Sequence, residues 1–317
     1  MRNTDVCKYI RGEYFVRILH IWDQAGVACT LAKYQTLLGH DSKVLIVGAI
    51  DKYGIYEFYR KYCTKIDRLD FVKTCLSEAE CADLIHVHSR SDLFLEVYRK
   101  FRTSKKIVLH YHGTDVRGFK GDDLKGMDLG RKIIVRSRRA ITRVRNRCRL
   151  LKLGYFESAN TQAQRISRIT LVSTPDLLGL VDSAIHLPAP IDTDHFKQYP
   201  SFNKQKKALT INTEVTNTEL ALKYCNSNNI NLDIEVYDRT KKPIMFKEMP
   251  QLLNKYEVYV DIRYVNDIIL VNLSKTAIES LACGLKVLDY GLNLRGSVPQ
   301  EHLPVNVTSL LSKLYSR

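Results

Sequence analysis

The sequence lacks any long apolar run. Its longest clear one, Val44–Ile50, is far shorter than the roughly 18 to 20 residues that a membrane-spanning helix needs. The N-terminal segment, MRNTDVCKYIRGEYF, also has no apolar centre of the kind found in secretory signal peptides. These two absences disfavour an embedded or secreted protein. We therefore expect the chain to reside in the cytoplasm, either free or peripherally on the inner face of the membrane.

Paired cysteines are also missing. The eight cysteines are scattered, and none forms a C-x-x-C pair, so neither a disulfide framework nor a cysteine zinc site is indicated. Histidines alternate on two predicted strands, His86 with His88 and His110 with His112, but no supporting carboxylate or cysteine pattern accompanies them. We therefore predict no metal site and no bound cofactor, and place His88 and His112 at the rim of a cleft.

Acidic residues are too few to balance the basic ones. The chain has 49 Lys and Arg against 34 Asp and Glu, a net charge of +15. Between Arg117 and Arg168 there are 15 basic residues and only 4 acidic ones, so most of the surplus lies in one segment. Such a segment attracts polyanions, which include nucleic acid, an anionic membrane surface and phosphorylated substrates.

A predicted helix at 131–153 carries much of this charge and has two different faces. Such a helix can lie in an anionic membrane interface, although a helix packed on the protein with a solvated basic face fits equally well. Specific nucleic-acid binding is not expected, because exposed aromatic residues do not alternate with the arginines. One stripe is apolar and the other basic: Ile134, Ile141, Val144, Cys148 and Leu151, against Arg136, Arg139, Arg143 and Arg147.

Apolar, β-branched runs alternate with helical patterns along the whole chain. Strands are predicted at 15–22, 43–47, 84–88, 106–111 and 169–173, with helices near 26–38, 92–101 and 131–153. After the proline-rich segment 187–200, strands follow at 208–212, 231–237, 258–263 and 286–289, with helices near 217–225, 249–255 and 275–283. This alternation is typical of parallel, doubly wound α/β sheets.

The pattern predicts two Rossmann-like domains facing each other across a cleft. The first would span 1–195, with a basic helical insert at about 117–165, and the second 196–317, with an amphipathic last helix at 306–317 packing back on the first domain. Ligands of such sheets bind beyond the carboxyl ends of the strands, where helix N-termini point N–H groups inward. In the linker, Asp192-Thr193-Asp194 is interpreted as a turn and helix cap instead of a metal-binding D-x-D motif.

The segment LSKTAIESLACG, at 273–284, carries the most specific signal. Ser274 and Thr276 suit the start of a helix, whose free N–H groups and positive end favour a phosphate. Lys275 adds a full charge, and Glu279, one turn further on, could grip two ribose hydroxyls. The alternative is a capped helix that only packs on a sheet.

LSKTAIESLACGLKVL resembles the donor-site segment of retaining GT-B glycosyltransferases of family 4. Three further stretches are similar to that family in the same order: WDQAGVACTLAKYQTLLGHDSKVLIV, VLHYHGTDVR, and LVSTPDLL followed by LPAPIDTDHF. The resemblance covers nearly the whole chain. It implies a GT-B fold, a nucleotide-sugar donor held mainly by the second domain, and transfer of a hexose-type sugar with retention of configuration and without a metal.

The same resemblance assigns roles to individual residues. His112 would contact the transferring sugar, while Asp23, Gln24, Gly26, His88 and Gly113 would line the acceptor side of the cleft. The family's pair of glutamates is incomplete, because Glu279 matches the second but Val271 stands at the first, with Asp267 the nearest acidic substitute. The family's Arg and Lys for the leaving diphosphate are also absent from their usual place, where Arg239 and Lys241 could substitute.

The sequence thus predicts a glycosyltransferase acting on a glycan or a lipid-linked acceptor. The competing hypothesis is a noncatalytic protein, either a degenerate glycosyltransferase or a basic module that binds nucleic acid or membrane.

Overall fold

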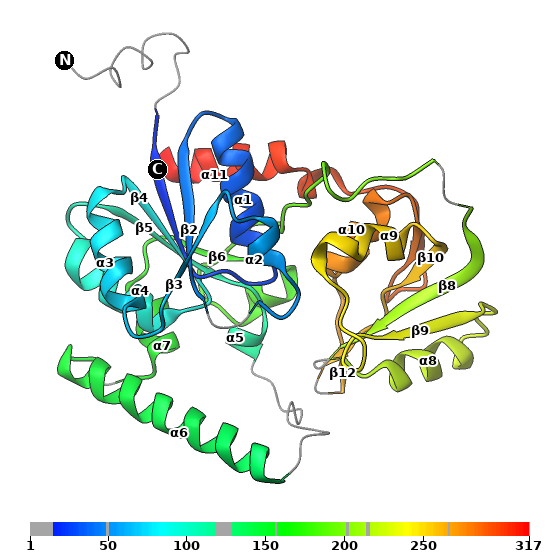
Figure 1. Ribbon diagram of the computed structural model, residues 1–317, viewed down its shortest axis with the longest axis horizontal. Helices are drawn as coiled ribbons and strands as arrows, with labels where there is room; N and C mark the ends of the chain where they lie inside the picture. The colour runs from blue at the N-terminus through cyan, green and yellow to red at the C-terminus, as the bar shows by residue number, and fades with distance from the viewer. Residues whose placement is uncertain are drawn as a thin grey trace.

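The computed structural model describes residues 15–48, 51–117, 129–155, 157–200, 203–213, 216–265 and 267–316. Two separate α/β sheets dominate it, one in each half of the chain (Figure 1). In these ranges no helix combines the length and the apolar character needed to cross a membrane. The predicted α/β class is confirmed.

The first sheet has seven strands, all parallel, in the order β3-β2-β1-β4-β5-β6-β7. The order reverses direction at the β1–β4 pair, where open α/β sheets bind their ligands. Sequence reasoning missed β3 and β7, because both are short edge strands without a buried apolar run. The strands are β1 Arg17–Ile21, β2 Asp41–Val47, β3 Cys63–Ile66, β4 Leu84–His88, β5 Lys106–Tyr111, β6 Thr170–Val172 and β7 Ile185–His186.

Helices cover both faces of this sheet. On one face lie α1 (Val27–Leu37) and the last helix, α11 (Pro304–Ser316), whose Leu311 packs in one buried cluster with Leu31. On the other lie α3 (Phe71–Cys81), α4 (Ser91–Phe101) and α7 (Ala159–Ile166). The chain thus returns from the second half to complete the first. Shorter elements are α2 Ile55–Phe58, α5 Thr114–Arg117 and the 3-10 turn η2 Pro175–Gly179.

The second sheet has five strands in the order β14-β13-β10-β8-β9, with only β14 antiparallel. Helix α8 (Thr218–Ser227) covers one face, while η3 (Phe246–Glu248), α9 (Met249–Leu253) and α10 (Lys275–Ala282) cover the face toward the first half. The strands are β8 Gln205–Asn212, β9 Ile234–Asp238, β10 Tyr256–Val260, β13 Lys286–Leu288 and β14 Leu294–Arg295; a hairpin is formed by β11 Tyr264–Val265 and β12 Ile268–Ile269, and η4 is Gln300–His302.

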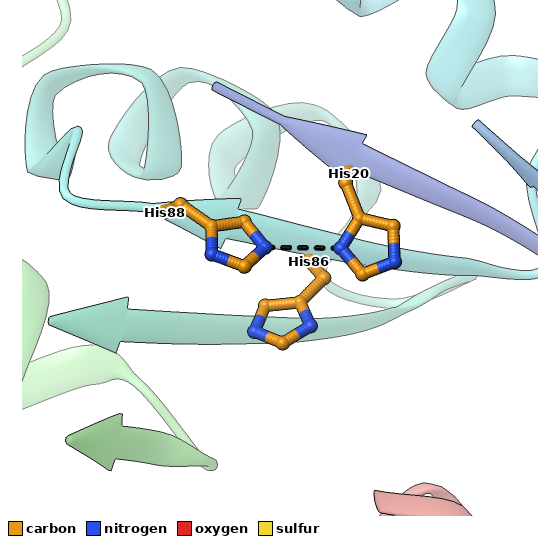
Figure 2. A group of neighbouring side chains, drawn as sticks. All are labelled: His20, His86 and His88. Carbon is orange, nitrogen blue, oxygen red and sulfur yellow. Dashed lines mark hydrogen bonds between the residues drawn. The ribbon is translucent and has the colours of Figure 1, made fainter. Parts of the chain in front are cut away.

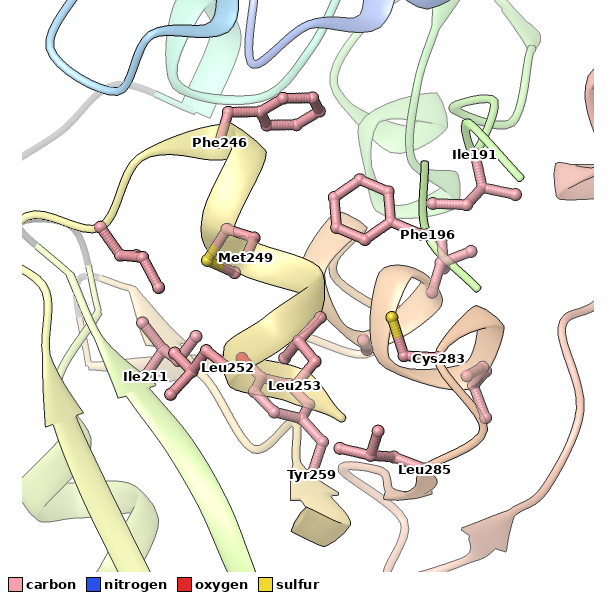
Figure 3. Close-up of a cluster of buried hydrophobic side chains, with 14 of the residues drawn as sticks. Ile191, Phe196, Ile211, Phe246, Met249, Leu252, Leu253, Tyr259, Cys283 and Leu285 are labelled. Atoms are coloured by element: carbon pink, nitrogen blue, oxygen red, sulfur yellow. The ribbon is translucent and has the colours of Figure 1, made fainter. Parts of the chain in front are cut away.

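One buried apolar cluster joins the two halves. It contains Ala28 and Tyr59 from the first half together with Phe246 and Ile278 from the second. Figure 3 shows Phe246, in η3 just before α9, beneath the blue ribbons of the first half. The buried linker carboxylate of Asp192 adds polar ties, accepting from Lys33 Nζ at 2.6 Å and from the Tyr59 hydroxyl at 2.8 Å. The facing elements of the two halves are therefore packed together.

Candidate functional site

The loop after β1 forms one wall of the site. The Asp23 carboxylate accepts from the Gly26 N–H at 2.7 Å and from the Ala28 N–H at 2.6 Å, which caps the first turn of α1. Gly26 has φ of 79°, and a Cβ there would lie 3.2 Å from Lys275 Nζ of the other half. Only glycine combines this backbone angle with so close an approach.

Lys275 reaches across to this loop from the first turn of α10. Its ammonium group donates a hydrogen bond to the Ala25 carbonyl oxygen. The helix start behind it is held by Ser274, whose Oγ accepts from the Ala277 N–H at 2.9 Å. The Ser274 N–H in turn donates to Asp261 Oδ2 at 2.8 Å. Asp261 was missed from sequence; its signal was a lone carboxylate directly after the strand.

Glu279 lies one turn further along α10 and is only 6% exposed. Burial raises its pKa to about 7, against the opposing charges of Lys275 and Arg239. The Arg239 guanidinium stacks on the Tyr53 ring of the first half, 3.7 Å from the centroid. Its buried Nε has no hydrogen-bond partner within the described ranges. A carboxylate and an arginine therefore meet at the junction of the two halves.

The pKa of Glu279 predicts a pH effect on stability. From pH 4.5 to about 7 the folded chain holds a proton that the unfolded chain has lost, so the free energy of unfolding falls as pH rises. Between pH 5.5 and pH 8, Glu279→Gln should remove about 2 kcal/mol of this fall. Urea unfolding at pH 5.5 and pH 8 measures it, with exposed Glu257→Gln as the matched control. An equal pH dependence in both variants would contradict the assignment.

His112 stands at the end of β5, on the same side of the junction as the loop after β1. The Asp115 carboxylate accepts from the His112 N–H at 2.9 Å and from the Gly113 N–H at 2.6 Å, which turns the chain into α5. Gly113 has φ of 143°, and a Cβ there would meet the Arg117 guanidinium at 2.4 Å. The half-buried imidazole has its pKa lowered to about 4, mainly by burial and partly by the charge of Lys275.

One sequence prediction needs correction. His88 does not lie at the cleft rim, since its side chain is 0% exposed; the inward face of β4 carries it beneath α1. The Lys241 side chain is 85% exposed and its ammonium pairs with Asp238 at 3.7 Å, so its predicted role at the diphosphate stays a prediction. Of the two proposed substitutes, only Arg239 approaches Glu279.

The positions of the remaining predicted residues neither support nor contradict their predicted roles. Gln24 and Thr276 are half-buried on the two walls. Asp267 is exposed at the turn of the β11–β12 hairpin with φ of 63°, and Val271 is exposed as well. A cavity of about 500 Å³ lies at the opposite end of the first sheet, lined by Lys106, Arg168 and others, and contains none of the predicted site residues.

Histidines gather on the inward face of the first sheet. His20, His86 and His88 form one group (Figure 2), and His88, His110 and His112 form another; within each, ring nitrogens lie within 4.8 Å of one another, which could hold a metal ion. Their ring nitrogens are also within hydrogen-bond distance, for example 2.9 Å from His20 Nδ1 to His88 Nε2. Burial lowers the pKa of the rings, so they are neutral.

The predicted basic helix is α6 (Leu129–Lys152), which runs along the lower edge of the first half in Figure 1. Its C-terminal end is anchored through Arg149, which pairs with Glu96 and lies 3.1 Å from Asp92. Ile141 and Val144 are 67% and 63% exposed. Arg136 and Arg147 are exposed too, whereas the side chains of Arg139 and Arg143 lie outside the described part.

Comparisons identify the architecture. No protein-family model and no curated protein matches the sequence. Among solved structures the chain is similar to an alpha-glucosyltransferase in complex with UDP and a 13-mer DNA containing an HMU base, with a TM-score of 0.53 and 9% identity over 96% of this chain and 91% of that one. A second such complex, with DNA containing a central A:G mismatch, has a TM-score of 0.50 and 10% identity over the same shares. These likenesses show the fold, and the predicted GT-B architecture is confirmed.

Proposed function

We propose that this chain is a retaining glycosyltransferase similar to family 4, which transfers a hexose-type sugar from a nucleotide-sugar donor to a glycan or lipid-linked acceptor. One observation carries the proposal. Lys275 of the second half reaches the Ala25–Gly26 loop of the first, and its charge acts on both Glu279 and His112. Residues singled out separately in the sequence thus lie near one another at the junction of the two halves, which supports a shared site there.

The donor is proposed to bind along the start of α10. A diphosphate there would accept hydrogen bonds from N–H groups of the first turn. The positive end of the helix and the Lys275 ammonium would attract its negative charge. Glu279 would accept hydrogen bonds from two ribose hydroxyls. The Arg239 Nε–H, which has no partner among the described residues, could donate a further hydrogen bond. The UDP named in the two similar complexes supports a nucleoside diphosphate as the leaving group.

The reaction would need charge and geometry more than a protein nucleophile. The bond from the anomeric carbon to the diphosphate oxygen breaks, and a bond to the acceptor oxygen forms on the same face of the sugar. The leaving phosphate takes the acceptor hydroxyl's proton, so atoms and charge balance. Positive charge already in place at the diphosphate lowers the barrier, because negative charge develops there in the transition state. His112 would contact the sugar as a neutral ring.

A lipid-linked acceptor agrees with the exposed face of α6, which would hold the enzyme at the inner membrane surface. Reversal of Arg136, Arg139, Arg143 and Arg147 to Glu should abolish co-sedimentation with anionic phosphatidylglycerol vesicles, because each cation near such a surface contributes about 1 kcal/mol. The matched control reverses four exposed lysines of the second half, Lys206, Lys223, Lys255 and Lys286. Equal losses in both variants would mean that net charge, not this face, binds the vesicles.

The experiment must distinguish this function from two alternatives. The first takes DNA as the acceptor, and it is favoured by the net charge of +15 and by the DNA in both similar complexes. A noncatalytic protein is the second candidate, favoured by the exposed Val271 where the family carries a glutamate.

Turnover of radiolabelled nucleotide sugars tests the function. The purified chain should release nucleoside diphosphate from one of the common donors, faster with a glycan or lipid-linked acceptor than with duplex DNA. NMR of the product should show the donor's anomeric configuration. Neither turnover nor binding of any common donor would overturn the proposal in favour of a noncatalytic protein.

A further inference from the structure

Four buried histidines and the half-buried His112 form a continuous hydrogen-bonded chain beneath the candidate site. His20 comes from β1, His86 and His88 from β4, and His110 and His112 from β5 and its end. All face the side of the sheet that α1 and α11 cover, because the neighbouring residues of opposite parity, such as Leu19 and Leu109, pack on the other side. We call these five residues the histidine chain.

Every ring nitrogen of the histidine chain has a partner. One end is Gln35 of α1 and the other is Tyr315 of α11, with the Ser173 hydroxyl inserted between His112 and His110. The successive distances are Gln35 Oε1 to His20 Nε2 2.8 Å, His20 Nδ1 to His88 Nε2 2.9 Å, His88 Nδ1 to His112 Nε2 2.9 Å, His112 Nδ1 to Ser173 Oγ 2.7 Å, Ser173 Oγ to His110 Nε2 2.9 Å, His110 Nδ1 to His86 Nε2 3.2 Å, and His86 Nδ1 to the Tyr315 hydroxyl 3.0 Å.

Counting donors and acceptors shows in which direction the hydrogen bonds of the histidine chain run. A carbonyl oxygen only accepts, so Gln35 Oε1 requires a proton on His20 Nε2. A neutral imidazole carries one N–H, so His20 Nδ1 must accept, and His88 Nε2 must donate to it. The same step repeats through His112 to the Ser173 hydroxyl, which has one proton to donate.

The direction continues to the far end. Because the Ser173 proton goes to His112, His110 Nε2 must donate to the Ser173 oxygen, His86 Nε2 must donate to His110, and the Tyr315 hydroxyl must donate to His86. All five rings then carry their proton on Nε2, and no donor faces another donor. A charged ring anywhere would break this order, which agrees with the lowered pKa of each ring.

We propose that the other four histidines, with Ser173, Gln35 and Tyr315, are positioning residues that hold His112 in a single tautomer and ring orientation, with the proton on Nε2. This rests on the proposed function, in which His112 contacts the sugar. Both ring nitrogens of His112 are bonded within the protein, Nε2 to His88 and Nδ1 to Ser173, so the sugar would meet an uncharged ring held in one orientation. The last helix thereby helps to set the chemistry of a residue in the cleft.

Nitrogen-15 NMR of the full chain with labelled histidine tests the tautomers directly. At pH 7 all five signals should show the Nε2–H form. Ser173→Ala should disturb His110 and His112 and raise the donor KM about 10-fold, as expected for one lost hydrogen bond, while Ser173→Thr, which keeps the hydroxyl, should restore both. Should Ser173→Ala fail to fold, Tyr315→Phe removes the donor at the far end, so it should shift the His86 Nδ1 signal and let part of the His112 rings take the Nδ1–H form.

Several results would overturn the proposal. Mixed or Nδ1–H tautomers, or an unaltered KM in Ser173→Ala, would end the positioning role. One equivalent of Zn²⁺ that displaces the ring protons would make the cluster a metal site instead. If the tautomers are as expected but the protein turns over no donor, the hydrogen-bond order of the histidine chain is supported and the proposed function is rejected.

Discussion

Lowering the pH from 7 to 5.5 is expected to destabilise the folded chain through the histidine chain by roughly 6 kcal/mol. In the unfolded chain these rings take up protons near their ordinary pKa of 6.5, whereas burial holds the folded His20 and His112 at about 4 and the other three well below 6.5. The unfolded state therefore binds more protons, and stability falls as pH falls through 6.5. A domain with 5–15 kcal/mol of stability loses a large part of it.

Glu279 acts in the opposite direction. Because its pKa is raised, the folded chain takes up a proton at Glu279 at a higher pH than the unfolded chain does. Over the same interval this raises the free energy of unfolding by about 2 kcal/mol. Five histidines outweigh one carboxyl group. The net expectation is a loss of roughly 4 to 5 kcal/mol and unfolding at a pH where many proteins are still stable.

Urea unfolding between pH 5.5 and 7.5 measures the effect, and its slope counts the protons taken up. His20→Gln should lower that uptake by about one proton, because one titrating ring is lost. Tyr315→Phe removes a hydrogen bond of the same chain but no titrating histidine, so it should lower stability and keep the slope. A free energy of unfolding that is constant over this range would show that the rings titrate normally when folded.

Lys275→Ala is expected to weaken binding of a nucleoside diphosphate about 10- to 100-fold, the usual cost of losing a charge-assisted hydrogen bond. The ammonium is the full positive charge at the first turn of α10, and Ala25 holds it at the opposite wall. Without it the helix end still offers N–H groups, so binding should weaken and not vanish.

Calorimetric titration with UDP and with other nucleoside diphosphates gives this comparison. Lys286→Ala, an exposed lysine on β13 of the same half, serves as the matched control and should bind as the parent does. Both variants should unfold as cooperatively as the parent, since Lys275 is only half-buried. An unchanged Kd for Lys275→Ala would show that the diphosphate does not bind at the start of α10.

Local sequence pattern was sufficient for elements whose signals are local. The strand at 106–111 and the helix beginning at Lys275 were both expected where they lie, because each has an apolar core and a turn or cap beside it. The edge strands β3 and β14 have no such pattern, since half-exposed side chains carry little periodicity. Asp261 was missed for another reason: a lone carboxylate after a strand does not reveal its partner, and here the partner is the Ser274 N–H, 13 residues further along.

By itself the sequence determined the α/β class and which residues follow strands: His112 after β5, and Lys275 and Glu279 on one helix. Only the tertiary structure decided their neighbours. It joined Lys275 to Ala25, placed Arg239 on Tyr53, buried His88 against expectation and left Lys241 exposed. The physical reason is that periodicity reports which face of an element is buried, whereas the pairing of polar groups depends on which distant elements share that face. The histidine chain, closed by a tyrosine from the last helix, is such a pairing.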